Sequence, residues 1–332
     1  MPDRPPKNEF KAEAAVKALD WKRSSLSLPE PARAPGYYCR QDREQRPLDI
    51  CFPASFASYN LLPDIRDPAL ELFARHRIVW HDDIDGGPSN HLLDSQVQCV
   101  NALAAGLHDP SFVVAAFAGI LAIDQVLPME DDLYVTFEYI GAENHLGERV
   151  GHERQRGNLS TSTDAAIRYR SRIDGQVEVA LIEWKYTEDY RGQELSETKG
   201  QHRQDRYRPL WEAEDCPIDK YVIPYADLFV EPFYQLMRQQ LLARRMEAAG
   251  ELGAVRVRIV HFCPGRNLGV RNALDRESQR SAGDDTLAIW ATMVRPADRF
   301  VSVDSERFVE LRGGEYARRY NVRCGGENDG DL

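Results

Sequence analysis

The stretch that decides the fold runs from residue 164 to residue 185 and reads Asp-Ala-Ala-Ile-Arg-Tyr-Arg-Ser-Arg-Ile-Asp-Gly-Gln-Val-Glu-Val-Ala-Leu-Ile-Glu-Trp-Lys. It predicts two strands joined by a turn at Asp174-Gly175, a dipeptide that readily adopts positive φ. Because side chains alternate across a strand, Glu183 and Lys185 share one face. Asp164 opens the partner strand, so the hairpin can bring its carboxylate to the same edge. Two acids and one ammonium at the end of a buried sheet are costly unless paired, and a metal would offset that cost.

The Glu-x-Lys pattern by itself is weak, because it also occurs at Glu9-Phe10-Lys11 and Glu197-Thr198-Lys199. Those copies lie in polar segments, where a solvated charge pair contributes little. The copy at 183 to 185 differs because it closes an apolar strand. Lys185 is also the only lysine between residues 23 and 198, in a chain with 7 Lys and 35 Arg. A chain that prefers arginine could have made a simple salt bridge with arginine, so the sequence favours a chemical role for this ammonium. The alternative is a strand-end salt bridge with Glu183 or Asp164.

These residues carry a resemblance to a known superfamily. Thr163-Asp164, followed after the turn by Ile182-Glu183-Trp184-Lys185, resembles the active-site signature of the PD-(D/E)XK restriction-endonuclease-like nucleases. More narrowly, the chain is similar to a family of bacterial nuclease-like proteins in that superfamily, over about residues 37 to 310. The segments that support this narrower likeness are Thr161 to Asp164, Glu183 to Glu188, Trp80-His81, Ser95 to Asn101 and His261 to Pro264. Threonine stands before Asp164 where the signature has proline.

The resemblance implies an α/β fold with a mixed central sheet flanked by helices, and with N-terminal helical additions. The sequence supplies the expected order of elements, namely a helix near 112–126, a strand at 133–140, the hairpin, further helices and a later strand. A helix capped by Asp94 or Ser95 precedes them, and a helix at 231–249 and a strand at 255–262 follow. We expect residues 1–35 to form a flexible leader with one short helix near residues 9–19, residues 36–320 a single nuclease-like domain with its core at about 95–265, and residues 321–332 a disordered tail.

The resemblance also implies roles for the residues at the hairpin edge. Asp164 and Glu183, with the backbone carbonyl of Trp184, would bind Mg²⁺, for which Mn²⁺ could substitute. Lys185 would orient the attacking water, help to deprotonate it, or offset negative charge in the transition state. Three further residues are auxiliary candidates, for positioning a second metal or a water and for a glutamine-bearing helix beside the site: Glu138, Glu148 and Gln201.

The composition limits the partners. A net charge of -11 excludes a protein that coats nucleic acid through a generally basic surface. The chain has no apolar run of the roughly 20 residues that span a bilayer, and no signal-peptide core, so we expect a cytoplasmic protein with free thiols. DNA is the expected substrate, and RNA is not excluded. The sequence is also compatible with a homodimer. The main alternative is a nuclease-fold module that binds DNA or protein without cutting, and a third interpretation is a purely structural hairpin.

Overall fold

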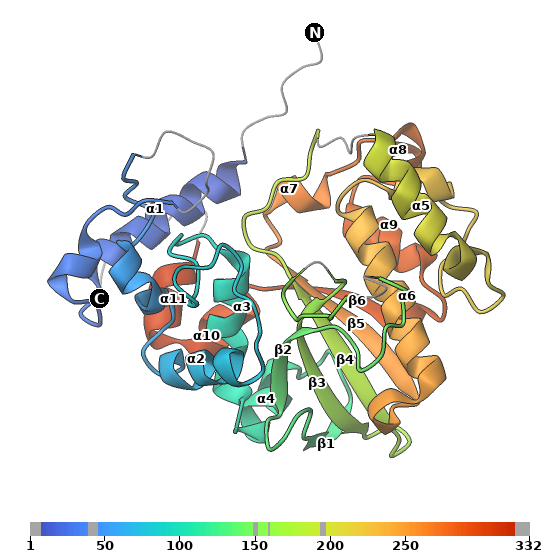
Figure 1. The fold of residues 1–332 in the computed structure, drawn as a ribbon, viewed down its shortest axis with the longest axis horizontal. Helices are drawn as coiled ribbons and strands as arrows, with labels where there is room; N and C mark the ends of the chain where they lie inside the picture. Colours follow the sequence, from blue (N-terminus) through green and yellow to red (C-terminus); the bar gives the residue numbers. More distant parts are fainter. Residues whose placement is uncertain (1–7, 39–45, 149–151, 159, 193–196, 323–332) are drawn as a thin grey trace, which may run out of the picture.

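A central six-stranded sheet with helices on both faces forms the body of the protein (Figure 1). A computed structural model describes residues 8–38, 46–148, 152–158, 160–192 and 197–322, with the backbone alone for 197–201. The strands are β1 (Ile123–Leu127), β2 (Val135–Tyr139), β3 (Thr163–Ser171), β4 (Val177–Trp184), β5 (Arg256–Cys263) and β6 (Phe300–Asp304). The helices are α1 (Glu9–Ser24), α2 (Arg66–Arg75), α3 (Ser95–Leu103), α4 (Pro110–Ala116), α5 (Glu197–Glu212), α6 (Phe233–Ala249), α7 (Leu268–Arg271), α8 (Glu277–Ala282), α9 (Thr286–Met293), α10 (Arg307–Arg312) and α11 (Gly314–Tyr320).

The sheet is mixed. Its strand order is β1-β3-β4-β5-β6, and β2 also pairs with β3. The pairs of β3 with β1, β2 and β4 are antiparallel, whereas β4 with β5 and β5 with β6 are parallel. Because β1 pairs with the second half of β3 and β2 with the first half, these two strands share one side of β3. The predicted fold class, a mixed sheet flanked by helices, is confirmed.

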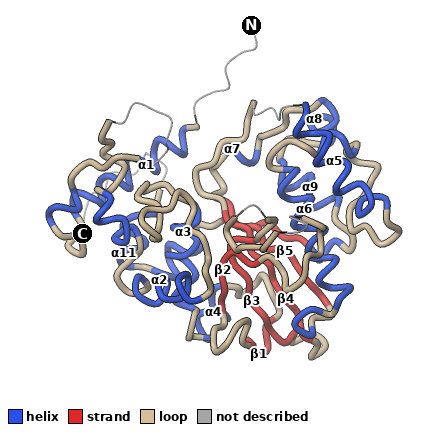
Figure 2. Tube along the Cα trace, viewed as in Figure 1, coloured by secondary structure: helices blue, strands red, loops and turns tan. Residues whose placement is uncertain are grey.

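Each face of the sheet buries its own apolar core. Ile182 and Trp184 of β4 belong to the core shared with α1 to α4, α10 and α11. Figure 2 shows α1, α2, α3, α4 and α11 on one side of the sheet and α5, α6, α8 and α9 on the other. Val179 and Leu181 point the opposite way, toward α6 and α9. This alternation is what a strand with both faces buried requires. It also places Glu183 on the α6 face, where a charged side chain must find partners among packed helices.

The hairpin forms as predicted. Gly175 has a φ of +70°, which lets the chain turn between β3 and β4. The register pairs Ala165 with Ile182, and continuing it by one residue places Asp164 opposite Glu183. The parallel pairing then places His261 of β5 next to Glu183. Asp164, Glu183 and His261 therefore form one row across three strands.

One predicted helix is wrong. The apolar segment 112–126 forms only the short helix α4, which ends at Ala116, and then strand β1, which begins at Ile123. Gly119, with a φ of +74°, stands between the two elements. An apolar run has the same appearance whether it is a buried helix or a buried strand, so periodicity could not separate them. Pairing of Val126 with Tyr169 of β3 decides the outcome.

The expected leader contains a longer helix than predicted, and this helix belongs to the packed fold. The helix α1 buries Phe10, Ala14, Ala18 and Trp21, and it packs against α11. The ring of Phe10 packs edge-on against Tyr186, with 6.2 Å between the ring centroids. Tyr186 packs in the same way against Tyr320 of α11, with 5.6 Å between the centroids. An apolar stripe in a segment rich in Pro and Lys was sufficient for docking. Residues 1–7 of the leader and 323–332 of the expected tail lie outside the described residues.

Two smaller expectations also find an answer in the described residues. Cys51, Cys99, Cys216 and Cys263 are free thiols, as predicted. None of the helices in the described ranges has the length and apolar character needed to cross a bilayer.

Candidate active site

The three principal residues meet where β3 begins and β4 ends. The antiparallel pairing of these strands brings the start of one beside the end of the other, so local sequence decides the encounter. The backbone N–H of Trp184 donates to Asp164 Oδ2 at 2.6 Å. Lys185 Nζ forms an ion pair with Glu183 Oε1. The structure therefore brings together all three side chains that the sequence singled out.

Burial makes the charges of this group interdependent. The side chain of Glu183 is 1% exposed and that of Lys185 is 7% exposed, whereas Asp164 is partly exposed. Burial raises the pKa of Asp164 well above its usual value, and the charge of Glu183 raises it further. Burial acts to lower the pKa of Lys185, but the neighbouring acids outweigh it and the pKa lies well above its ordinary value. Lys185 therefore remains an ammonium at neutral pH.

A glutamine from helix α6 completes the environment of Glu183. Gln239 Nε2 donates both to Glu183 Oε2 and to the carbonyl oxygen of Ser162, the latter at 3.1 Å. Gln239 Oε1 is buried and has no hydrogen-bond partner among the described residues. Sequence reasoning does not find this residue, because the apolar positions that recur along this helix indicate core packing. The available signal was two successive glutamines, Gln239 and Gln240, on a helix face that is otherwise apolar.

The auxiliary candidate Glu138 lies in the same network. Its carboxylate accepts from Gln96 Nε2 and from Ser162 Oγ, both at 2.7 Å. Burial raises the pKa of Glu138; its two hydrogen bonds oppose this rise, and the charge of Glu183 adds to it. Glu138 has a φ of +50°, an uncommon conformation for a residue with a side chain. A third buried acid therefore stands close enough to Asp164 and Glu183 to influence them electrostatically.

The auxiliary candidate Glu148 has a different position. Its carboxylate accepts from the backbone N–H and the hydroxyl of Thr161, each at 2.6 Å, and from the hydroxyl of Tyr207. These bonds tie the segment before β3 to helix α5. Within the described part of the chain, Glu148 makes no contact with Asp164, Glu183 or Lys185, so its role in this structure is to hold the loop. The candidate Gln201 lies in α5, and its side chain is outside the described part.

Helix α3 supports the end of β4 from the opposite face. Asp94 caps this helix by accepting from the N–H of Val97 at 2.9 Å, as its sequence predicted. Trp184 Nε1 donates to Gln98 Oε1 at 2.9 Å. The indole is fully buried, so this bond fixes its orientation. Because Trp184 stands between Glu183 and Lys185, fixing it also fixes the backbone that presents both charged residues.

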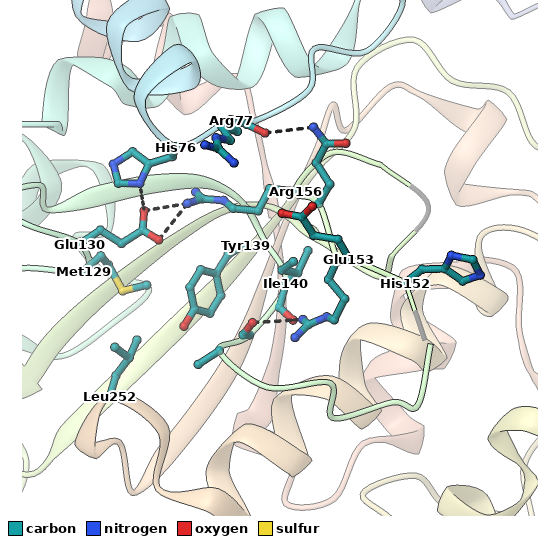
Figure 3. A pocket seen from close by; sticks show the side chains of 14 residues that line it. His76, Arg77, Met129, Glu130, Tyr139, Ile140, His152, Glu153, Arg156 and Leu252 are labelled. Atoms are coloured by element: carbon teal, nitrogen blue, oxygen red, sulfur yellow. Dashed lines mark hydrogen bonds and ion pairs between the residues drawn. The ribbon is translucent and has the colours of Figure 1, made fainter. Parts of the chain in front are cut away.

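Two arginines of the loop before β3, Arg154 and Arg156, bind groups inside the protein. A cavity of about 670 Å³ lies between the end of α2, the end of β2 and segment 152–156 (Figure 3). Arg156 in its wall binds Glu130 through Nη1 at 2.8 and 2.9 Å. Arg154 donates to the carbonyl oxygens of Ile140 and Gly141. None of the principal candidates lines this cavity, so it is separate from the hairpin edge.

Comparison with known proteins identifies the family. The family model described as "Restriction Endonuclease associating with ARP" matches residues 15–320. The chain belongs to this restriction endonuclease family. The match includes the entire hairpin and supports the resemblance to restriction-endonuclease-like nucleases. Comparison with curated proteins found no match, and comparison with solved structures found none.

The hairpin edge of this restriction endonuclease family member fits a hard divalent cation. Its donors are carboxylate and carbonyl oxygens, which Mg²⁺ prefers. Oδ1 of Asp164 accepts no hydrogen bond from a described residue, and Oε1 of Gln239 has no partner. Across the described ranges, no group of three or more His, Cys, Asp or Glu is arranged to hold a metal. Mg²⁺ commonly binds through one or two carboxylates and keeps several waters, so two acids are sufficient.

Proposed function

We propose that this protein hydrolyses phosphodiester bonds in DNA with the help of Mg²⁺. The observation that carries the proposal is the meeting of Asp164, Glu183 and Lys185 at one sheet edge, in a chain from a restriction endonuclease family. Two acids and one ammonium at a shared edge are what metal-assisted hydrolysis needs. A structural hairpin would need only a single charge pair.

Asp164 and Glu183, with the carbonyl oxygen of Trp184, would hold the cation. When bound, Mg²⁺ supplies Lewis-acid polarisation of the phosphodiester and lowers the pKa of an attacking water. The N–H of Trp184 orients Asp164, and Gln239 orients Glu183, so both carboxylates are held before substrate arrives. Such prior orientation lowers the reorganisation that the reaction requires.

Lys185 would act as a charged donor. Its raised pKa keeps the amine protonated at neutral pH, so it donates hydrogen bonds and cannot accept a proton. Glu183 accepts one hydrogen bond from the ammonium, and the centroid of the Tyr190 ring lies 6.0 Å from Nζ. The remaining N–H groups can orient water or offset the charge that develops on the phosphate oxygens. Glu138, tied to Ser162 and Gln96, would position a water beside Asp164.

A plasmid cleavage assay tests the proposal. Wild-type protein should cut DNA in Mg²⁺ and leave it intact in EDTA. Lys185→Ala should lower the rate by about 100-fold or more, the usual effect of removing one transition-state donor. Lys220→Ala is the matched control, because Lys220 is an exposed lysine outside the hairpin. This variant should cut DNA at the wild-type rate.

Two results would reject the proposal. Equal rates for Lys185→Ala and wild type would remove the ammonium from the reaction. Calorimetric binding of Mg²⁺ to wild type without cleavage of any tested DNA would instead indicate a module that binds and does not cut. Asp164→Ala should abolish the calorimetric signal, which tests the cation site without depending on activity.

A further inference from the structure

Two arginines beside the hairpin edge share one aromatic ring. Arg238 of α6 lies over Tyr234 with its Cζ 4.5 Å from the ring centroid, and Arg203 of α5 lies 4.9 Å from the same centroid. The ring is 5% exposed and is packed against Tyr207 and Phe229. Contact with a fixed aromatic face restricts the planes of both guanidinium groups.

Arg238 is close to the candidate catalytic residues. Its Nη1 donates to Thr161 Oγ1 at 3.0 Å, three residues before Asp164. The next residue on the helix is Gln239, which binds Glu183. The same turn of α6 therefore presents one side chain to the catalytic acid and one guanidinium to the segment that leads into β3.

The charge of Arg238 has no direct counterion among the described residues. Its Nε is buried and has no hydrogen-bond partner. Of the nearby acids, Glu148 is bound by Thr161 and Tyr207, and Glu231 Oε2 accepts from the N–H of Gln235 at 3.2 Å. Several other partly buried arginines bind carboxylates directly, among them Arg156, Arg191, Arg256, Arg258, Arg271 and Arg299. Arg66 and Arg154 instead donate to backbone carbonyl oxygens. A half-buried cation without a carboxylate is costly, and an external anion would offset the cost.

Arg203 also lacks a carboxylate partner among the described residues. It is partly exposed, and it makes no ion pair with a described residue. The two guanidinium groups therefore present donors from two helices at one place, next to an acidic site. Guanidinium donors match the oxygens of a phosphate in pairs, and they remain charged at every accessible pH.

We propose that Arg238 and Arg203 form a subsite for the backbone phosphate of duplex DNA next to the bond that is cut. The inference rests on the proposed function for the identity of the substrate. Arg238 would bind the phosphate nearer to Asp164, and Arg203 would bind the same or the adjacent phosphate from α5. The subsite supplies positive charge where a protein with a net charge of -11 would otherwise repel DNA.

Binding of a fluorescent DNA duplex in EDTA tests this subsite without any cleavage. Arg238→Gln should weaken binding roughly 10- to 100-fold at low salt, the usual effect of losing a charged hydrogen bond. It should also lower the slope of log affinity against log salt by about 0.9 for the lost phosphate contact. Arg203→Gln should weaken binding by a smaller factor, and Arg238→Lys should restore part of the salt slope.

The matched control is Arg245→Gln, which removes an exposed arginine from the same helix. It should bind as wild type does. A merely structural role for Arg238 would lower the thermal midpoint while leaving the salt slope of the folded protein unchanged, and that result would overturn the inference. Equal affinities for wild type, Arg238→Gln and Arg203→Gln would overturn it as well.

Failure of the subsite and failure of the proposed function give different results. If wild type binds DNA through Arg238 and cleaves nothing in Mg²⁺, the subsite stands and the nuclease proposal falls. If wild type cleaves DNA and both arginine variants bind and cleave equally well, the nuclease proposal stands and the subsite falls.

Discussion

Replacing Asp164 with asparagine should stabilise the metal-free protein. Neighbouring strands are about 4.8 Å apart. When both are ionised, two acids at paired positions therefore repel each other by about 3 kcal/mol at an effective dielectric constant near 20. Asparagine keeps the shape and can still accept from the N–H of Trp184. Attraction to Lys185 and water at the partly exposed Asp164 reduce the gain, which leaves about 1–2 kcal/mol.

The gain should depend on pH in one direction. Asp164 has a pKa raised well above its usual value in the folded protein, because of burial and the nearby acids. An acid of this kind stabilises the folded state below its unfolded pKa of about 3.9, and this contribution is lost as pH rises through the folded pKa. Wild type and Asp164→Asn should therefore be equally stable near pH 4. The variant should become the more stable as pH rises.

Thermal unfolding in EDTA measures this difference. With an unfolding entropy of about 2.1 cal/mol/K per residue over 332 residues, 1 kcal/mol corresponds to about 1.4 °C. We expect Asp164→Asn to unfold about 2 °C above wild type at pH 8, and Mg²⁺ to raise the midpoint of wild type alone. Asp124→Asn, at an exposed position of β1, should behave as wild type in both conditions. A lower midpoint for Asp164→Asn at pH 8, or an equal response of both proteins to Mg²⁺, would refute the reasoning.

Three further changes separate catalysis from stability. Gln239→Leu keeps the size of the side chain but removes both of its donated bonds, so cleavage should fall about 10- to 100-fold in single-turnover kinetics. Glu148→Gln should lower the free energy of unfolding by about 1–3 kcal/mol in a denaturant titration, while calorimetry shows unchanged Mg²⁺ affinity. Glu178→Gln leaves two arginines without their shared, fully buried carboxylate, so it should lower the free energy of unfolding by about 3–5 kcal/mol. Cleavage by that variant below its unfolding temperature should equal wild type, because Glu178 lies at the far end of β4.

The features that sequence could predict are those decided by local rules. The turn at Asp174-Gly175 sets the pairing of β3 with β4, and this pairing alone brings Asp164 beside Glu183. The cap at Asp94 begins helix α3 by the same kind of local rule. Alternation along β4 then assigns each side chain to a face without knowledge of any other element.

The features that sequence could not predict depend on contacts between distant segments. Gln239 reaches Glu183 across 56 positions, and nothing in the helix that carries it indicates which strand it will meet. The segment after Ala116 becomes a strand because β3 offers it a partner, which a local pattern cannot reveal. Glu148 was an equal candidate with Glu138 in the sequence, and only the fold shows that Thr161 and Tyr207 occupy it.

The edge-to-face packing of Tyr186 between the rings of Phe10 and Tyr320 has a consequence for how the protein is made. The residue that follows Lys185 obtains its aromatic neighbours from α1, which leaves the ribosome early, and from α11, which leaves it some 300 residues later. A nascent chain that has emerged only as far as β5 lacks the Tyr320 side of this aromatic support. The lysine end of β4 therefore obtains its full aromatic support only after α11 has been translated.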